Sequence, residues 1–145
     1  MDIIVKIQEQ SISISPQNVI TGKICFVADK ICFPDKDWND FPIVILTWWL
    51  KAITNIDKGQ FELQFMDGPF SVRGTILAED ILILEFVQRS EKDIMMFSGN
   101  GSLQVLKDSI MMAAKQLIDI ASNRHWESTD LVELRQALEK TTKLG

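Results

Sequence analysis

The stretch from residue 35 to residue 70 constrains the fold more than any other part of the chain. It reads DKDWNDFPIVILTWWLKAITNIDKGQFELQFMDGPF. An acidic loop leads into a nearly uncharged segment, which is followed by a strand of alternating apolar and polar residues and by an Asp-Gly-Pro turn. Helix, strand and tight turn therefore follow one another closely, which favours a fold that mixes helices with antiparallel strands.

Residues 41–56 predict a buried helix. Asn39 or Asp40 is expected to cap it, Pro42 suits its first turn, and Gly59 is expected to stop it. Residues 43–46 would also fit a buried strand, but the apolar stretch continues without a turn residue, which favours the helix. The apolar residues at helical spacing are Phe41, Ile45, Trp48, Trp49, Ala52 and Ile56.

Three of the tryptophans bear on what the chain exposes. Trp48 and Trp49 point about 100° apart on a helix, so one is expected in the core. The other either packs in a second layer or forms an exposed patch. Trp38 lies in the acidic loop, where it is either an aromatic contact for a partner or a structural plug.

The strands expected from alternation and β-propensity give the fold class. The parity of the apolar residues switches between Ile7 and Ile12, so residues 8–10 must hold a bulge or a turn. Residues 98–101, Ser-Gly-Asn-Gly, predict a loop. The expected strands are residues 3–7, 12–14, 19–28 (with Ile24 and Phe26 inward), 60–66, 70–77, 81–88 and a short 94–97.

Two helices are expected at the C-terminal end. Ser102 caps the first, and Asp130 with Glu133 resembles a capping box for the second, which bears Leu131, Leu134 and Leu138. The apolar stripe of the first helix is Leu103, Leu106, Ile110, Ala113, Ala114, Leu117 and Ala121. We therefore expect one α+β domain over residues 1–145, an antiparallel meander of about five to six strands with helices mainly on one face.

Charge and hydropathy restrict the class of partner. The net charge is −5, and residues 1–100 carry all of that excess, with 14 acids against 9 bases. This disfavours a nucleic-acid partner and suits a basic protein, although the excess is also compatible with a solubility charge. No apolar run approaches the roughly 20 residues that a bilayer requires, and no signal peptide is recognisable, so we expect no membrane partner and a cytoplasmic protein.

The chain contains no recognisable catalytic set. His125 is its one histidine, and the spacing of Cys25 and Cys32 matches neither a redox pair nor half of a zinc site. The two cysteines are expected to be small core residues, with a disulfide or a metal role as the alternative. Asp35, Asp37 and Asp40 do not fit an EF-hand loop. We therefore expect no enzyme activity, no cofactor and no metal.

The aromatic and turn positions carry a family resemblance. The segments Trp38-Asn39-Asp40-Phe41, Trp48-Trp49-Leu50 and Phe65-Met66-Asp67-Gly68-Pro69-Phe70 resemble small bacterial immunity proteins, which are encoded beside polymorphic or contact-dependent growth inhibition toxins. The resemblance covers about residues 35–120. It implies a non-enzymatic toxin inhibitor that binds a toxin domain and masks its active site or a surface it needs. It transfers no binding residue, because such interfaces diverge with each toxin.

Loops and turns supply the expected contact residues, because they are free to meet a partner while the sheet and helices hold them in place. The expected partner is a basic toxin domain, for example a nuclease, which is neutralised by stoichiometric occlusion. A small adaptor or regulatory protein unrelated to toxins is the alternative, and an enzyme of unrecognised class comes third. The candidate partner-binding residues are Asp35, Asp37, Trp38, Asp40, Asp67, Glu79 and Asp80.

Overall fold

The computed structural model describes residues 1–144, and its mixture of strands and helices confirms the expected α+β class. A short 3₁₀ helix, Glu9–Ser11, fills the break predicted at residues 8–10. The strands are β1 (Ile3–Ile7), β2 (Ser13–Ile14), β3 (Ile20–Ala28), β4 (Ile31–Phe33), β5 (Asn39–Asp40), β6 (Gln60–Gln64), β7 (Phe70–Ile76), β8 (Ile81–Gln88) and β9 (Ile94–Ser102). The helices are α1 (Pro42–Thr54), α2 (Leu103–Asn123) and α3 (Thr129–Leu144).

The strands form two antiparallel sheets instead of one. In the five-stranded sheet, β3 is central and pairs with β1, β2, β4 and β5. The other sheet is the expected meander, in the order β6-β7-β8-β9. The long strand β3 uses both of its edges for short neighbours, so it has no edge free for the meander. Alternation in a sequence predicts strands but not their partners.

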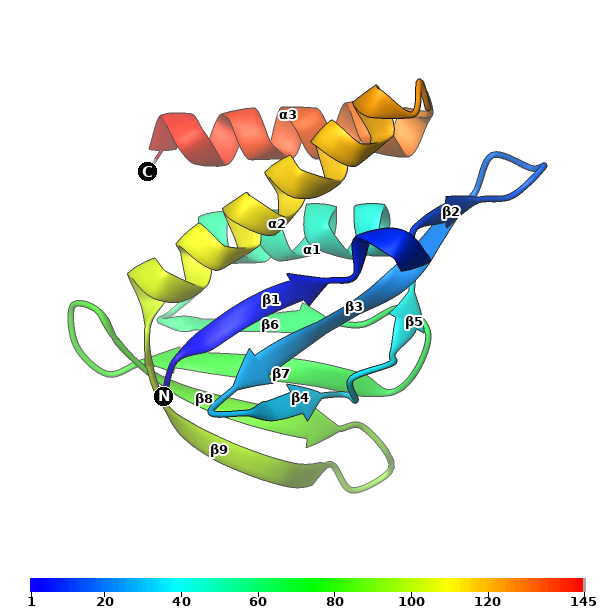
Figure 1. Ribbon diagram of the computed structural model, residues 1–145. Coiled ribbons are helices and arrows are strands. Elements are labelled where there is room, and N and C mark those ends of the chain that lie inside the picture. The colour runs from blue at the N-terminus through cyan, green and yellow to red at the C-terminus, as the bar shows by residue number, and fades with distance from the viewer. Residues whose placement is uncertain (145) are drawn as a thin grey trace.

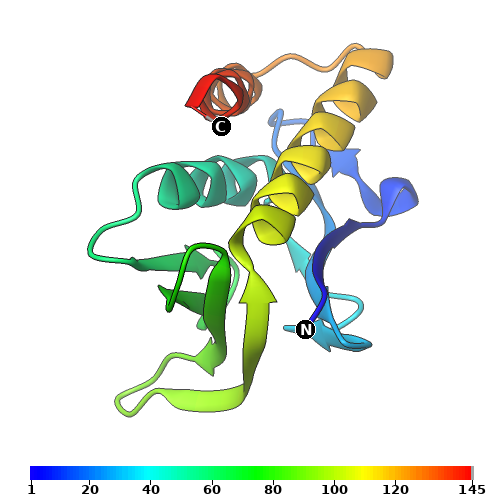
Figure 2. The same ribbon diagram turned by 90° about the vertical axis from the view of Figure 1, so that its left-hand side faces the viewer.

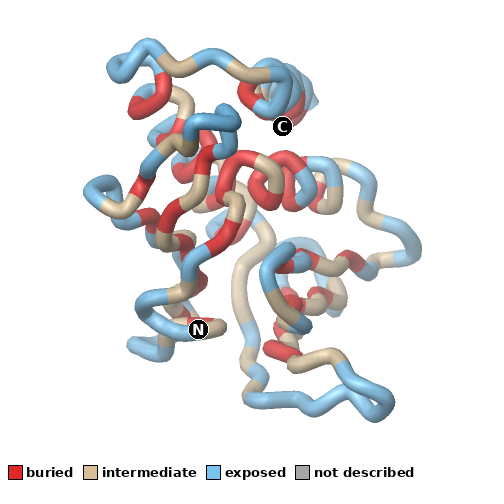
Figure 3. Tube along the Cα trace, turned by 90° about the vertical axis from the view of Figure 1, so that its right-hand side faces the viewer, coloured by how far each residue is buried: buried red, intermediate tan, exposed pale blue. Residues whose placement is uncertain are grey.

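The two sheets lie side by side (Figure 2), and aromatic side chains pack between them. The ring centroids of Phe33 on β4 and Phe86 on β8 are 5.2 Å apart, and those of Phe26 on β3 and Phe65 after β6 are 5.9 Å apart. The helices lie together on the β6 side of the four-stranded sheet, with α3 outermost (Figure 1). Buried residues are concentrated in α1 and on the strands that face each other (Figure 3).

Helix α1 confirms the predicted helix but not its predicted ends. Pro42 occupies the first turn as expected, whereas Phe41 is the N-terminal flanking residue, because Asn39 and Asp40 pair with β3 as β5. The helix ends at Thr54, before Gly59, which instead takes a φ of +75° in the turn that enters β6. Asn39 and Asp40 are suitable capping residues, but their backbones pair with β3 and do not cap the helix.

The two adjacent indoles of α1 differ in burial. Trp49 is fully buried and is the core residue of the pair. Trp48 is 39% exposed, so it contributes exposed surface and is not packed in a second layer. The helix packs against strands on one side and helices on another, which makes its buried surface wider than the predicted stripe. The buried apolar residues of α1 are Pro42, Ile43, Ile45, Leu46, Trp49, Leu50 and Ile53, whereas Phe41, Ala52 and Ile56 are half-buried.

The region predicted as a loop at residues 98–101 belongs to strand β9. Its pairing with β8 continues to Ser102, and a Cβ atom on Gly99 would lie 2.0 Å from the methyl carbon of Met1. The glycine therefore makes room for the N-terminal residue and does not mark a turn. This is the physical reason why the loop prediction is wrong.

The two C-terminal helices follow the predicted pattern with one changed cap. The Ser102 hydroxyl accepts a hydrogen bond from the Val105 amide at 3.1 Å, which confirms it as the cap of α2. For α3, the Leu131 amide donates to the Ser128 hydroxyl at 3.2 Å, so Ser128 is the cap instead of Asp130. The predicted stripe of α2 is buried, apart from Leu103, which is half-buried.

Candidate functional site

The seven predicted contact residues lie at two separate ends of the four-stranded sheet. The first group joins the loop before α1 to the β6–β7 turn, and the second forms the β7–β8 turn. Strand β7, which has seven residues, separates them by roughly 23 Å. The first group is Asp35, Asp37, Trp38, Asp40 and Asp67, and the second is Glu79 and Asp80.

Asp40 is the centre of the first group and is only 1% exposed. Its Oδ2 accepts hydrogen bonds from the indole Nε1 of Trp38 at 2.9 Å and from the Asp67 amide at 3.1 Å. Its Oδ1 accepts one from the Phe41 amide at 2.7 Å. A partner cannot reach this carboxylate, so the prediction that Asp40 contacts a partner is corrected. The residue joins the loop, the start of α1 and the β6–β7 turn.

Trp38 is half-buried and packs between the two sheets. Its ring lies edge-to-face on Phe70 at a centroid distance of 5.3 Å and on Phe65 at 6.2 Å. A Cβ atom on Gly68 would lie 2.7 Å from the Cη2 atom of this indole, and Gly68 has a φ of +154°. Trp38 therefore has a structural role, and part of its side chain remains at the surface.

Three carboxylates of the first group are exposed. The Asp35 Oδ1 accepts a hydrogen bond from the Asp37 amide at 2.7 Å, which shapes the loop, and the Asp37 carboxylate lies 3.4 Å from Lys23 Nζ. Asp67 is exposed in the β6–β7 turn, which its amide joins to the buried carboxylate of Asp40. We call Asp35, Asp37, Trp38, Met66 and Asp67 the acidic loop surface.

Met66 is the member of this surface that sequence reasoning missed. It is 43% exposed and precedes Asp67 in the turn. The signal was present, because Phe61, Leu63 and Phe65 alternate inward and leave the next residue outside. An exposed methionine gives the acidic loop surface an adaptable apolar part.

In the second group, Asp80 has a structural role. The Asp80 carboxylate accepts hydrogen bonds from the Ser102 hydroxyl and, at 2.8 Å, from the Gln104 amide. These bonds lower the pKa of Asp80, the Ser102 hydroxyl having the larger effect. Asp80 thus closes the first turn of α2, where a negative charge is favourable. Glu79 beside it is exposed.

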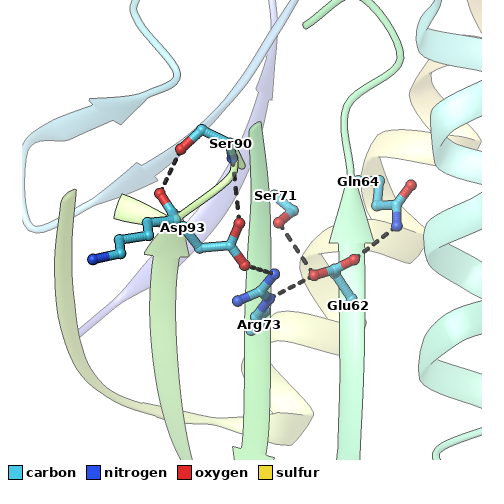
Figure 4. Close-up of polar contacts among 7 residues, drawn as sticks. Glu62, Gln64, Ser71, Arg73, Ser90 and Asp93 are labelled. Carbon is cyan, nitrogen blue, oxygen red and sulfur yellow. Dashed lines mark hydrogen bonds and ion pairs between the residues drawn. The ribbon is translucent and has the colours of Figure 1, made fainter. Parts of the chain in front are cut away.

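A polar network crosses the outer face of the four-stranded sheet (Figure 4). Arg73 on β7 pairs with Glu62 on β6 at 2.6 Å and with Asp93 before β9 at 2.7 Å. Burial alone would raise the pKa of Glu62, but hydrogen bonds from Arg73, Gln64 and Ser71 outweigh it and lower the pKa. The same arginine lowers the pKa of Asp93. The network holds the β8–β9 loop to the sheet.

The cysteines and the histidine offer no nucleophilic arrangement. Cys25 is buried and Cys32 is half-buried, and both are free thiols. Burial, followed by the neighbouring Cys32, raises the pKa of Cys25 to about 12, which makes it a poor nucleophile. His125 lies exposed after α2, next to Arg124, whose guanidinium stacks 4.9 Å from the centroid of the Trp126 ring.

Residues 1–144 present neither a cluster of metal ligands nor a helix that could span a membrane. Within that range, histidine, cysteine and acidic side chains do not gather in groups of three or more that could hold a metal ion. None of the helices described combines the length and apolar character needed to cross a membrane. Comparisons of the chain with protein-family models, with curated proteins and with solved structures find no match.

Proposed function

We propose that this protein is a non-enzymatic inhibitor that binds a basic toxin domain in the cytoplasm and blocks it by stoichiometric occlusion. The acidic loop surface is its proposed contact surface. The proposal joins the resemblance to bacterial immunity proteins with the distribution of charge, since residues 1–100 carry 14 acids and 9 bases. A basic partner would be attracted to this part of the chain over several ångströms of solvent.

One observation carries the proposal: Asp40 joins two loops that come from different sheets and that both carry exposed acids. The buried Asp40 links both loops by hydrogen bonds, while Asp37 and Asp67 on these loops are exposed. Trp38 and Met66 add apolar surface on the same two loops. An apolar centre with charges around it is the usual arrangement of a protein interface, in which the centre contributes affinity and the rim contributes rate and specificity.

The proposal is tested with the product of the reading frame adjacent to this gene. Both chains are co-expressed, and the complex is measured by size-exclusion chromatography with light scattering. We expect a complex of fixed stoichiometry and growth arrest by the neighbouring product alone, with growth restored in proportion to the amount of this protein. Growth arrest that this protein does not relieve, or two chains that elute separately, would overturn the proposal.

A further inference from the structure

The carboxylate of Asp40 is buried and is held by three N–H donors, two from its own stretch of chain, residues 38–41, and one from the turn between β6 and β7. Within residues 1–144, no lysine or arginine forms an ion pair with it. Its donors are the indole of Trp38 and the amides of Phe41 and Asp67. A buried carboxylate is costly unless hydrogen bonds compensate for the lost water, and three such bonds at the N-terminal end of α1 provide that compensation.

The three donors belong to different structural elements. Phe41 precedes α1, Trp38 belongs to the loop after β4, and Asp67 belongs to the turn between β6 and β7. The two loops come from different sheets, and the hydrogen bonds through Asp40 connect them directly. Loss of the carboxylate would remove this hydrogen-bonded link and leave the two loops joined by the packing of Trp38 on Phe65 and Phe70.

We propose that Asp40 is a positioning residue, which holds Trp38 and the turn at Asp67 in one fixed arrangement before any partner arrives. A surface that is already ordered loses less conformational entropy on binding, so the arrangement raises affinity without a contact between Asp40 and the partner. The role in binding rests on the proposed function, whereas the positioning itself is a property of the free protein.

The first experiment measures hydrogen exchange in the free protein by NMR. In the wild type, the indole N–H of Trp38 should exchange at least about tenfold more slowly than that of Trp48, which is exposed. In Asp40→Asn, the side chain loses its charge and one of its two acceptor oxygens, so its bonds to the Trp38 indole and the Asp67 amide should weaken and both N–H groups should exchange about tenfold faster. Equal exchange of the two wild-type indoles would overturn the proposal even if the variant failed to fold.

Thr141→Val is the matched control for this substitution. Thr141 is also 1% exposed, and its hydroxyl bonds to the Ala137 carbonyl and lies 3.1 Å from the Thr54 hydroxyl. It lies between α1 and α3, in a separate set of contacts from the two loops. Its replacement should leave exchange at Trp38 and Asp67 unchanged. Equal acceleration in both variants would mean that Asp40 acts only through global stability, which would overturn the proposal.

The second experiment measures binding kinetics with the product of the adjacent reading frame, as a variant that no longer arrests growth. Asp40→Asn should weaken binding about tenfold, whereas Thr141→Val should not change it. If the wild type binds and Asp40→Asn binds equally well, the proposed role in binding is wrong. If the wild type does not bind, the proposed function fails, and the exchange experiment alone decides whether Asp40 positions the loops.

Discussion

The indole Nε1 of Trp49 donates a hydrogen bond of 2.7 Å to the backbone carbonyl of Gln64. Gln64 ends β6, an edge strand of the four-stranded sheet, and an unpaired edge is open to association with other strands. The same indole stacks on Phe26 at 4.6 Å and meets Phe65 edge-to-face at 5.2 Å. Trp49 therefore joins α1 to both sheets and satisfies a carbonyl at the sheet edge.

Trp49→Phe should destabilise the protein by about 1–3 kcal/mol, because the Gln64 carbonyl loses its donor and a cavity replaces part of the indole. Trp48→Phe is the matched control. Its indole is 39% exposed, so the change should stay within about 0.5 kcal/mol. Denaturant unfolding measures both. Equal midpoints for the two variants would mean that the buried indole contributes nothing specific.

The apolar stripe of α2 gives a second prediction about stability. Leu106 and Leu117 are almost completely buried, so Leu→Ala at either position should cost about 2–5 kcal/mol. Met112 on the same helix is 72% exposed, and Met112→Ala should change stability by less than about 0.5 kcal/mol. Thermal and denaturant unfolding would report both effects. Wild-type midpoints for both leucine variants would contradict the packing of α2.

The sequence predicted elements well where one local rule decides the structure. The hairpin at Asp67-Gly68 formed as expected, because alternation and turn chemistry agree there, and Ser102 caps α2 for the same reason. Prediction failed where distant segments compete for the same residues. Asn39 and Asp40 were expected to cap α1, but they pair with β3, and Gly99 admits Met1.

The candidate site was predictable in its residue types but only partly in its arrangement. The exposed acids Asp35, Asp37 and Asp67 were named from loop chemistry alone. The burial of Asp40 could not be predicted, because a buried carboxylate depends on hydrogen-bond donors, and one of the Asp40 donors comes from a distant segment of the chain. The separation of Glu79 and Asp80 from the others was predictable, because the two turns that flank β7 in an antiparallel meander lie at opposite ends of that strand.

The network around Arg73 should make stability depend on acidic pH. The pKa values of Glu62 and Asp93 lie below their ordinary values of 4.5 and 3.8 in the folded state, so the unfolded chain binds more protons in that range. The contribution is complete above the ordinary values and is lost as the pH falls through the lower, folded ones. Unfolding free energies measured from about pH 6 to about pH 3 should therefore decrease with acid.

Arg73→Leu should flatten this decrease, because both carboxylates then lose the guanidinium that lowers their pKa values. Arg135→Leu is the control, since Arg135 forms only a longer surface contact of 3.6 Å with Glu127. The control variant should keep the wild-type pH profile. The same acid slope in Arg73→Leu and wild type would show that the network does not create it.

Gly68 and Trp38 should be energetically coupled. A Cβ atom on Gly68 would lie 2.7 Å from the Trp38 ring, so Gly68→Ala should cost about 1–3 kcal/mol through overpacking, in addition to backbone strain. In a Trp38→Ala background the collision disappears, and the cost should fall to the strain alone. A double-mutant cycle in denaturant would measure this coupling. Strictly additive changes would contradict the observed packing.

Charge reversal on the acidic loop surface should act on the rate of association. Asp37→Lys with Asp67→Lys removes two exposed carboxylates, and we expect slower binding to a basic partner, with a weaker dependence of that rate on salt. The control pair, Asp119→Lys with Glu133→Lys, makes the same change in net charge at exposed positions on α2 and α3. Stopped-flow or surface-based kinetics at two salt concentrations would compare them. If both pairs slow association equally, net charge alone attracts the partner and the acidic loop surface has no special role.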